Sequence, residues 1–395
     1  MNPVVVIGIN HHNTLGVIRA LGRAGLKDFI FVILVGGDGF VSKSKYVKRT
    51  QLYIIPSDNE IYATLCSLHI QKKGVVICCS DSSIATIDGY RETLSHKFII
   101  PGIKNKQGAV AAFMDKERQI EFAKNVGLNI PDSKVYTASS SLELCPWDVY
   151  PCIIKPIDSV TGSKSDIRVC ESKNDYFKQL NRLDGRVIIV QKLITKIAEY
   201  QLIGCSLNNG EEIIIPGFTH ILRQPDNTNT GFLEYCPFTE DVDMLDTLNK
   251  GRKFIKELGY SGLFSLEFIR GDDGRDYFLE INMRNDGNGI SVTDAGCNLP
   301  YIWYAGNMNI SDEKTSERSI RRILVMPEFD DFVLVLKRKV SFLQWLKDIK
   351  RSDSFMDYSR DDKKPFYSRL LSFISFLFKY SIKIIWSSFK RLLHF

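Results

Sequence analysis

The sequence predicts an α/β fold that begins with a doubly wound parallel sheet, continues into an α+β part, and ends in a helical tail. Apolar, β-branched runs at residues 3–9, 29–35, 51–55 and 74–79 alternate with helical stretches, which is typical of βαβ units. Two later pairs of strands are joined by the short turns LNNGE and GDDG, as in hairpins. The last segment, 363–395, combines basic and apolar side chains without an acid.

Length and composition predict a folded protein of several domains. A chain of 395 residues exceeds the usual size of one hydrophobic core, and its 44% apolar and 25% charged residues are typical of folded chains. We expect a Rossmann-like domain at 1–108, an α+β domain at 109–310, an extension at 311–362 and the tail at 363–395. The net charge of +6 is too small to indicate nucleic-acid binding.

The cysteines and the N-terminus predict a cytoplasmic protein. The nine cysteines show no C-x-x-C and no metal-ligand spacing, so we expect reduced thiols. The opening MNPVVVIGIN has no basic leader before its apolar run and is interpreted as a strand. The turn GINHHNTLG lacks the G-x-G-x-x-G spacing of dinucleotide-binding loops. His11 and His12 are expected to be turn residues, although the helix start beside them could receive an anion.

The strongest chemical pattern lies in the second hairpin, GLFSLEFIRGDDGRDYFLEINMR. One strand carries Glu267 and the next carries Glu280, so the turn brings the two carboxylates together. Asn282 follows Glu280 by two residues, and the two-residue period of a strand points both side chains to one face. Three such oxygen ligands suit Mg²⁺. Arg284 continues the same step and places a guanidinium where it could stabilise developing negative charge.

A solvent-facing hairpin with alternating charges is the simpler interpretation of the same residues. It is disfavoured because Glu280 stands between apolar neighbours in YFLEIN, where a charge is costly unless something binds it. We therefore expect a metal site.

This hairpin resembles the ATP-grasp superfamily, whose hallmark is a Glu on one strand and Glu-x-Asn-x-Arg on the next. The matching residues are Glu267 and the run Glu280-Ile281-Asn282-Met283-Arg284. The whole resemblance extends over roughly residues 4 to 305. It includes five motifs that are weak individually but occur in the family's order. It implies bound ATP and Mg²⁺, with Mn²⁺ as an alternative metal.

Two upstream lysines continue the resemblance. Lys116, in MDKERQ, resembles the family's first nucleotide lysine, and Lys155, in CIIKP, resembles the second, which reaches the α-phosphate and the adenine edge. Either could instead be an ordinary surface lysine, but Lys155 interrupts an apolar strand. The phosphate loop departs from the family, because residues 158–166 contain only one glycine, Gly162. Hydroxyl side chains and backbone N–H groups remain available there to phosphate.

The run QKLI resembles the family's hinge strand. Its residues are Gln191, Lys192, Leu193 and Ile194. The resemblance implies that backbone groups of Lys192 and Leu193 bond the adenine, and Gln191 stands where an acid is common. Glu199 resembles the acid that takes the ribose hydroxyls, and Glu212 is left open as a substitute.

The segment HILRQPDNTNTGFLEYCPF resembles a stretch of one ATP-grasp subgroup, which includes D-aspartate ligase and polysaccharide-associated carboxylate–amine ligases. The resemblance implies that Arg223 faces the phosphates or the acyl substrate as a catalytic residue. It also implies that Gly231 belongs to a mobile substrate loop. The alternative is an exposed loop arginine.

Together these resemblances imply an ATP-dependent carboxylate–amine ligase. ATP would phosphorylate a substrate carboxylate, and an amine would attack the acyl phosphate, giving an amide, ADP and phosphate. The protein would supply positioning and charge stabilisation. One alternative is a soluble ligase that joins free amino acids or other small metabolites, with the tail as a homodimer contact. A second is a non-catalytic nucleotide-binding regulatory protein.

Residues 363–395 predict a basic amphipathic helix. Arg369, Lys379 and Lys383 share one side, whereas apolar residues such as Ile374 occupy the other. Such a helix suits an anionic membrane interface, and it would place the protein on the inner face of the membrane beside a cell-surface glycan or cell-wall precursor. A transmembrane span is not expected, because the lysines interrupt the apolar windows. The alternative is a helix docked on the protein's own surface.

Overall fold

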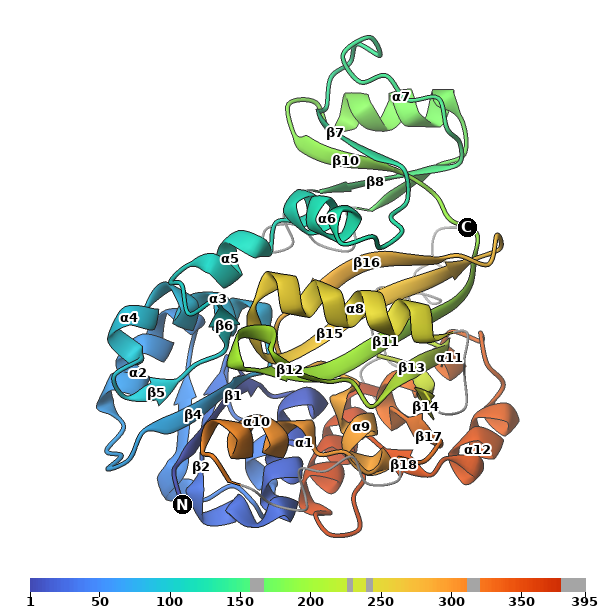
Figure 1. Cartoon of the computed structure of the whole chain (residues 1–395). Coiled ribbons are helices and arrows are strands. Elements are labelled where there is room, and N and C mark those ends of the chain that lie inside the picture. Colours follow the sequence, from blue (N-terminus) through green and yellow to red (C-terminus); the bar gives the residue numbers. More distant parts are fainter. Residues whose placement is uncertain (157–166, 226–229, 239–243, 311–319, 378–395) are drawn as a thin grey trace, which may run out of the picture.

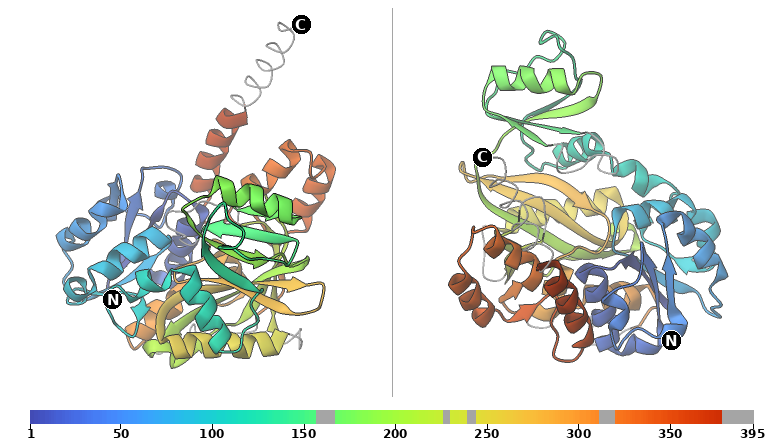
Figure 2. Two further views of the ribbon diagram at one scale, coloured as in Figure 1. Left: turned by 90° about the horizontal axis from the view of Figure 1, so that it is seen from above. Right: turned by 180° about the vertical axis from the view of Figure 1, so that it is seen from behind.

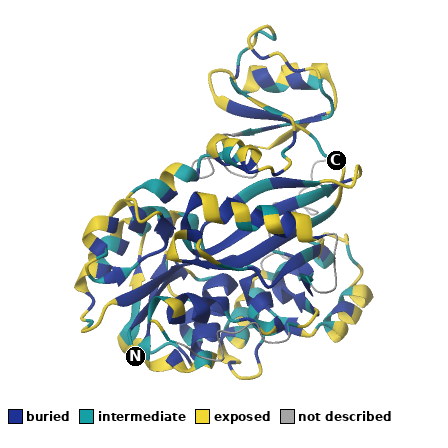
Figure 3. Ribbon diagram, in the orientation of Figure 1, coloured by how far each residue is buried: buried dark blue, intermediate teal, exposed yellow. Residues whose placement is uncertain are grey.

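Three sheets organise the computed structural model, which describes every residue except 157–166, 226–229, 239–243, 311–319 and 378–395. A five-stranded parallel sheet and a nine-stranded sheet lie together in the body of the molecule, and a four-stranded sheet stands apart at the top of Figure 1. Figure 3 shows that the strands of the body are mostly buried, whereas exposed residues cover the outer helices. The predicted α/β and α+β division is present.

The first sheet has the strand order β3-β2-β1-β4-β5, and every pairing in it is parallel. Its strands are β1 (Val4–Ile9), β2 (Ile30–Val35), β3 (Leu52–Ile55), β4 (Gly74–Cys78) and β5 (Phe98–Ile99). Its helices are α1 (His12–Leu21), α2 (Ile61–Ser67), α3 (Asp81–Gly89) and α4 (Arg91–Leu94). The continuous apolar runs of β1 and β4 arise because both strands are covered on both faces. The carboxyl ends of β1 and β4 therefore meet at one edge, beside the starts of α1 and α3.

The small sheet is antiparallel, with the order β7-β10-β8-β9. Its elements are β7 (Ser133–Thr137), β8 (Cys152–Pro156), β9 (Arg168–Cys170), α7 (Lys173–Arg182) and β10 (Val187–Lys192). Tyr176 and Leu180 of α7 are fully buried against this sheet and form a separate hydrophobic core with it. The small sheet therefore has a core of its own.

The large sheet has the order β16-β15-β11-β13-β14-β17-β18, with β12 paired to β11 and β6 paired to β15. Its strands are β6 (Gly102–Ile103), β11 (Lys196–Leu207), β12 (Glu212–Ile214), β13 (Gly217–Arg223), β14 (Phe232–Pro237), β15 (Tyr260–Gly271), β16 (Asp276–Asn282), β17 (Ile323–Met326) and β18 (Ser354–Phe355). α8 (Leu245–Leu258) covers one face, as Figure 1 shows. Both predicted hairpins are present, as β11–β12 and β15–β16.

Two helices connect the large sheet to the first. α9 (Gly289–Ala295) and α10 (Leu299–Asn307) pack against α1, and the indole N–H of Trp303 donates to the backbone oxygen of Val76 at 3.1 Å. The body of the molecule is therefore continuous across the predicted boundary at residue 108.

The sequence predicts one helix over residues 109–126, but the structure has two there. α5 (Ala109–Phe113) ends before Asp115, whose carboxylate accepts the N–H of Arg118 at 3.0 Å and caps α6 (Lys116–Asn125). An aspartate in this position satisfies an N–H group that the first helical turn leaves unpaired. Lys116 is consequently the first residue of a new helix.

The C-terminal part contributes α11 (Glu328–Leu336), α12 (Phe342–Arg351) and helical residues 364–377. In the left view of Figure 2 the last of these, coloured red, points outward from the body. The sequence predicts that Arg369 lies on the basic side of the tail helix, opposite its apolar side. Its guanidinium instead bonds Asp357 at 2.5 and 2.7 Å and Asp330 at 2.9 and 3.2 Å, because these carboxylates compensate its burial. The first part of the tail therefore docks on the protein itself.

None of the helices in the described part of the chain has the length and apolarity needed to cross a bilayer.

Candidate active site

Four polar side chains form a row across adjacent strands of the large sheet. Thr219 on β13 pairs with Gln201 on β11, Gln201 pairs with Glu267 on β15, and Glu267 pairs with Glu280 on β16. Residues directly opposite in an antiparallel pair have their side chains on the same face. The sheet register therefore places two carboxylates next to each other, beside an amide and a hydroxyl.

Glu267 is the buried carboxylate of this pair, and it accepts hydrogen bonds from two side-chain amides. The side-chain nitrogen of Asn282 donates to its Oε1 at 2.8 Å, and that of Gln201 donates to the same oxygen at 3.2 Å. Asn288 holds Gln201 in turn, because its amide donates to the Gln201 oxygen at 2.8 Å. Charge-assisted hydrogen bonds of this kind allow a carboxylate to remain ionised when buried.

Glu280 faces Glu267 and is half-buried. The pairing shifts by one residue immediately after this pair, so β16 bulges beside the site, as strands often do next to functional groups. Two ionised carboxylates side by side repel each other unless a cation lies between them. The arrangement is therefore chemically suited to binding a metal ion.

Arg284 lies just beyond the metal-ligand candidates. Its Nη2 donates to Oδ1 of Asn282 at 3.1 Å, and its Nε and Nη2 donate to the carboxylate of Asp81 at 3.1 and 3.3 Å. Burial opposes its charge, but Asp81, Asp286 and Glu267 together hold the pKa of this guanidinium above its usual range. Arg284 is therefore a permanent positive charge beside the carboxylate pair.

Lys155, on β8 of the small sheet, reaches back towards the same region. Its ammonium donates to Oε1 of buried Gln191 at 2.8 Å. Burial, and after it the positive charge of Lys116, lower the pKa of Lys155 to about 8, although the charge of Glu280 partly opposes them. Those interactions mean that both predicted nucleotide lysines share one electrostatic environment with Glu280.

Lys116 is positioned through the helix that it begins. One turn later, the side-chain oxygen of Gln119 accepts the backbone N–H of Ile281 at 3.1 Å. Ile281 stands between Glu280 and Asn282 on β16. The start of α6 is thereby tied to the strand that carries the metal-ligand candidates.

Two of the hinge N–H groups already have acceptors within the protein. The backbone N–H of Lys192 donates to Asp132 O at 2.8 Å, and that of Leu193 donates to Pro151 O at 3.0 Å. The backbone N–H of Ile194 has no backbone acceptor within the described ranges. Of the N–H groups of residues 192–194, that of Ile194 is therefore the one left for an adenine in the described part of the chain.

Glu199 lies at the start of β11, where Lys196 donates to it at 2.6 Å and Gln224 donates at 3.2 and 3.3 Å. Ribose hydroxyls would have to share or replace these partners. Glu212 pairs with Leu207, eight residues along the strand from Glu199 and so about 26 Å away. This distance argues against the substitute left open from the sequence.

Arg223 has a neighbourhood different from the predicted one. Its Nε and Nη2 donate to Asp331 at 3.0 and 2.7 Å, and its Nη1 donates to Asp348. Both carboxylates are fully buried. The contacts are those of a structural ion pair that joins β13 to the C-terminal helices, because two buried carboxylates require its charge. A catalytic role for Arg223 stays a prediction.

Several site residues lie outside the sequence motifs. Asp81 follows β4, and Asn13, the second residue of α1, donates to Asn285 O at 2.9 Å. Both residues belong to the parallel-sheet domain, which therefore contributes to the site. His11 caps α1 through Nδ1, and burial, followed by the charge of His12, lowers the pKa of His11 to about 3. Among the site residues that the motifs missed, only Gln201 could have been recognised from the sequence. It lies two residues after Glu199, so alternation along a strand places both side chains on one face.

Three predicted segments fall outside the described residues. They are the candidate phosphate loop at 158–166, the stretch 226–229 of the candidate substrate loop, and residues 378–395 of the predicted tail helix, which include Lys379 and Lys383.

Comparisons with known proteins agree with this architecture. No family model matches the chain. Over 214 residues it is 26% identical to formate-dependent phosphoribosylglycinamide formyltransferase of Flavobacterium psychrophilum. The match covers 53% of this chain and 50% of that protein, so the chain spans about half the length of this relative.

Solved structures match over more of the chain. An N5-carboxyaminoimidazole ribonucleotide synthetase in complex with ADP aligns with a TM-score of 0.64 and 14% identity, over 86% of this chain and 85% of that one. An L-amino acid ligase from Bacillus licheniformis aligns with a TM-score of 0.60 and 13% identity, over 82% and 78%. The chain therefore has the fold of the ATP-grasp ligases, as predicted.

Proposed function

We propose that this protein is an ATP-dependent ligase that activates a small carboxylate by phosphorylation and joins it to an amine, forming ADP and a C–N bond. The observation that carries this proposal is the opposed pair Glu267 and Glu280, flanked by Asn282 and Arg284. Lys116 and Lys155 lie within electrostatic reach of that group. The arrangement combines anionic metal ligands with cations suited to phosphate.

The donor set fits Mg²⁺, and Mn²⁺ is the alternative. Glu267 and Glu280 would supply two carboxylates, and Asn282 would supply its amide oxygen after its side chain rotates away from Arg284. Within the described ranges, no three His, Cys, Asp or Glu side chains gather closely enough to hold a metal. Mg²⁺ commonly uses one or two carboxylates with substrate phosphates and water. When bound, it would neutralise charge on the transferring phosphoryl group.

The chain's own residues would act mainly by position and charge. Lys116 and Lys155 would bind the phosphates, and the hinge at 191–194 and Glu199 would hold the adenine and ribose. The substrate carboxylate would attack the γ-phosphorus, giving an acyl phosphate and ADP. The amine would then attack the acyl carbon and expel phosphate as it loses a proton. Arg284 would stabilise the negative charge of the tetrahedral adduct.

Small metabolites are the favoured substrates. The names of the similar proteins refer to formate, a ribonucleotide and amino acids, all of which are small molecules. The parallel-sheet domain would help choose the substrate, because Asp81, Asn13 and His11 stand at its edge beside Arg284 and Asn285. A glycan or cell-wall precursor, and the D-aspartate ligase subgroup, stay predictions.

The test is release of ADP from the purified full chain across a panel of paired carboxylates and amines. We expect ADP only when a cognate pair is present, and we expect Glu280→Gln to reduce its release by roughly 10²–10³-fold. Glu257→Gln is the control, because Glu257 is exposed on α8.

Undiminished turnover in Glu280→Gln would contradict the assigned site. Tight ATP binding without ADP release for any pair would instead support a non-catalytic regulatory protein.

A further inference from the structure

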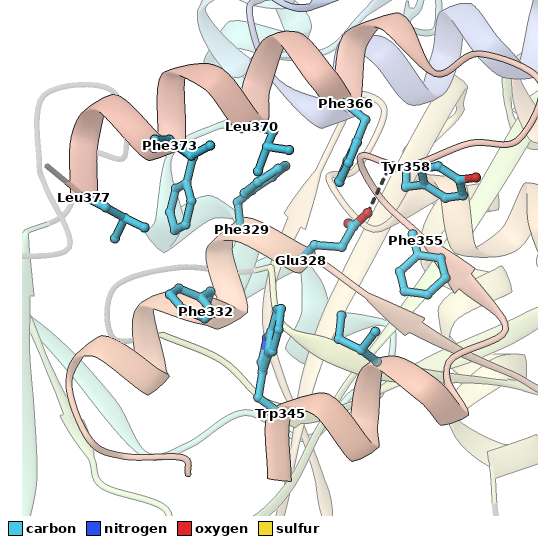
Figure 4. Close-up of a pocket in the computed structure, with 12 residues that line it drawn as sticks. Glu328, Phe329, Phe332, Trp345, Phe355, Tyr358, Phe366, Leu370, Phe373 and Leu377 are labelled. Atoms are coloured by element: carbon cyan, nitrogen blue, oxygen red, sulfur yellow. Dashed lines mark hydrogen bonds between the residues drawn. The ribbon is translucent and has the colours of Figure 1, made fainter. Parts of the chain in front are cut away.

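An apolar groove opens between α11, α12 and residues 364–377 (Figure 4). It encloses about 470 Å³. Aromatic side chains from all three helices line it, and they include Phe329, Phe332, Trp345, Phe366 and Phe373. Figure 4 shows these rings pointing towards one another across the groove.

The floor of the groove offers no unpaired charge. Glu328 is the acid there, and its oxygens accept the backbone N–H groups of Asp357 at 3.1 Å and Tyr358 at 2.8 Å. Burial, with the neighbouring Asp357 carboxylate, raises the pKa of Glu328 to about 8. A ligand in the groove would therefore meet an almost wholly apolar surface.

The helices that form the rim of the groove, α12 and residues 364–377, also expose large apolar side chains. On α12, Leu343 is 71% exposed and Leu346 is 42% exposed, and on the last helix Leu371 is 69% exposed. Phe342 and Phe376 are also exposed. Exposed apolar side chains gathered on helices that line one groove favour an interaction site, because water solvates them poorly.

The same helices carry exposed basic side chains. Lys347, Lys350 and Arg351 are exposed on α12. Arg351 pairs with the one acid of that helix, Asp348, which is buried and also bonds Arg223. The helical residues 364–377 contain no acid. Interleaved basic and large apolar side chains complement an anionic lipid surface, whose headgroups attract the cations while its chains accept the apolar groups.

The groove is already formed in the free protein, because ion pairs hold the last helix in place. Arg369 fixes the last helix through Asp357 and Asp330, so that Phe373 and Leu377 face the groove. The chain then continues from the end of the groove for residues 378–395, which carry four basic residues and no acid among apolar ones. The sequence that follows the groove therefore has the same combination of basic and apolar residues.

We propose that the groove and its rim form a docking surface for an anionic lipid bilayer, with lipid acyl chains entering the groove. This surface goes beyond the proposed ligase reaction and does not depend on it.

Vesicle flotation of the full chain tests the proposal. Vesicles of phosphatidylcholine with an equal amount of phosphatidylglycerol are compared with phosphatidylcholine alone. We expect binding to the anionic vesicles, and a loss of at least about tenfold in partitioning for Leu343→Asp and, separately, for Leu371→Asp. Leu144→Asp is the matched control, because Leu144 is 68% exposed near the small sheet.

Unchanged thermal unfolding in each variant would show that lost binding is not lost folding. Binding by Leu343→Asp and Leu371→Asp equal to that of the unsubstituted chain would overturn the proposal, as would equal binding to both vesicle types. A dimer that Leu343→Asp disperses, without any vesicle binding, would identify the groove as a contact between two copies and would also overturn it.

Discussion

Arg284 and Asp81 form an ion pair that joins the candidate catalytic strand to the parallel-sheet domain. Nε of Arg284 lies 3.1 Å from Oδ1 of Asp81, and Nη2 lies 3.3 Å from Oδ2. The arginine follows β16, whereas the aspartate begins α3 at the carboxyl end of β4. The parallel-sheet domain therefore orients the guanidinium that the ligase reaction would use.

Asp81→Asn should lower kcat by roughly tenfold to a hundredfold, because a misplaced catalytic group loses orientation. Stability should change little, since the Asp81 side chain is 46% exposed. Steady-state ADP release at saturating ATP measures the effect. Asp28→Asn is the control, because Asp28 forms an exposed ion pair with Lys48 in the same domain. An equal decrease in both variants would contradict the positioning role.

ATP affinity should decrease as the pH rises above about 8. Burial, with the charge of Lys116, lowers the pKa of Lys155 to about 8, so the ammonium that would bind phosphate is present below that pH and is lost above it. The Kd for ATP should then rise about tenfold per pH unit.

Calorimetric titration between pH 6.5 and 9.5 (about one unit or more on each side of this pKa) measures the slope. Lys155→Met should bind weakly with no such slope, and Lys134→Met, at an exposed lysine on β7, should retain it. A slope that persists in Lys155→Met would assign the titration to another group.

Gln119→Leu should weaken ATP binding, although Gln119 itself is not predicted to contact ATP or the metal ion. Its loss removes the acceptor for the buried N–H of Ile281, which should cost roughly 1–3 kcal/mol of stability. It should also raise the KM for ATP, because the start of α6 would no longer hold Lys116 against β16. Lys124→Gln, on an exposed part of the same helix, should change neither quantity. Normal KM with reduced stability would limit Gln119 to a structural role.

Arg223→Met should reduce the free energy of unfolding by roughly 3–5 kcal/mol, because it leaves Asp331 and Asp348 buried without their cation. Arg351→Met removes a second partner of Asp348, but Arg351 is 54% exposed and its loss should cost less than about 1 kcal/mol. Urea unfolding measures both. A hundredfold loss of kcat in Arg223→Met with unchanged stability would support the catalytic role predicted from the sequence.

Local patterns were sufficient for much of the fold and for the centre of the site. The apolar runs of β1 and β4 could be recognised because buried parallel strands require such runs. Glu280 and Asn282 could be placed on one face because alternation along a strand depends only on neighbouring residues. The break before Lys116 could not be recognised in this way, because the polar run DKERQ at 115–119 has no apolar period and only the cap by Asp115 begins the second helix.

The sequence by itself determined the first four strands of the parallel sheet, the hairpin of Glu267 and Glu280, and the basic, apolar character of the tail. Only the tertiary structure decided which partners the arginines have. Arg284 meets Asp81, Arg223 meets Asp331, and Arg369 meets Asp357. The first two pairs join residues more than a hundred positions apart, and no local period encodes such separations. A buried guanidinium is stabilised by whichever carboxylates the packing of distant elements brings to it.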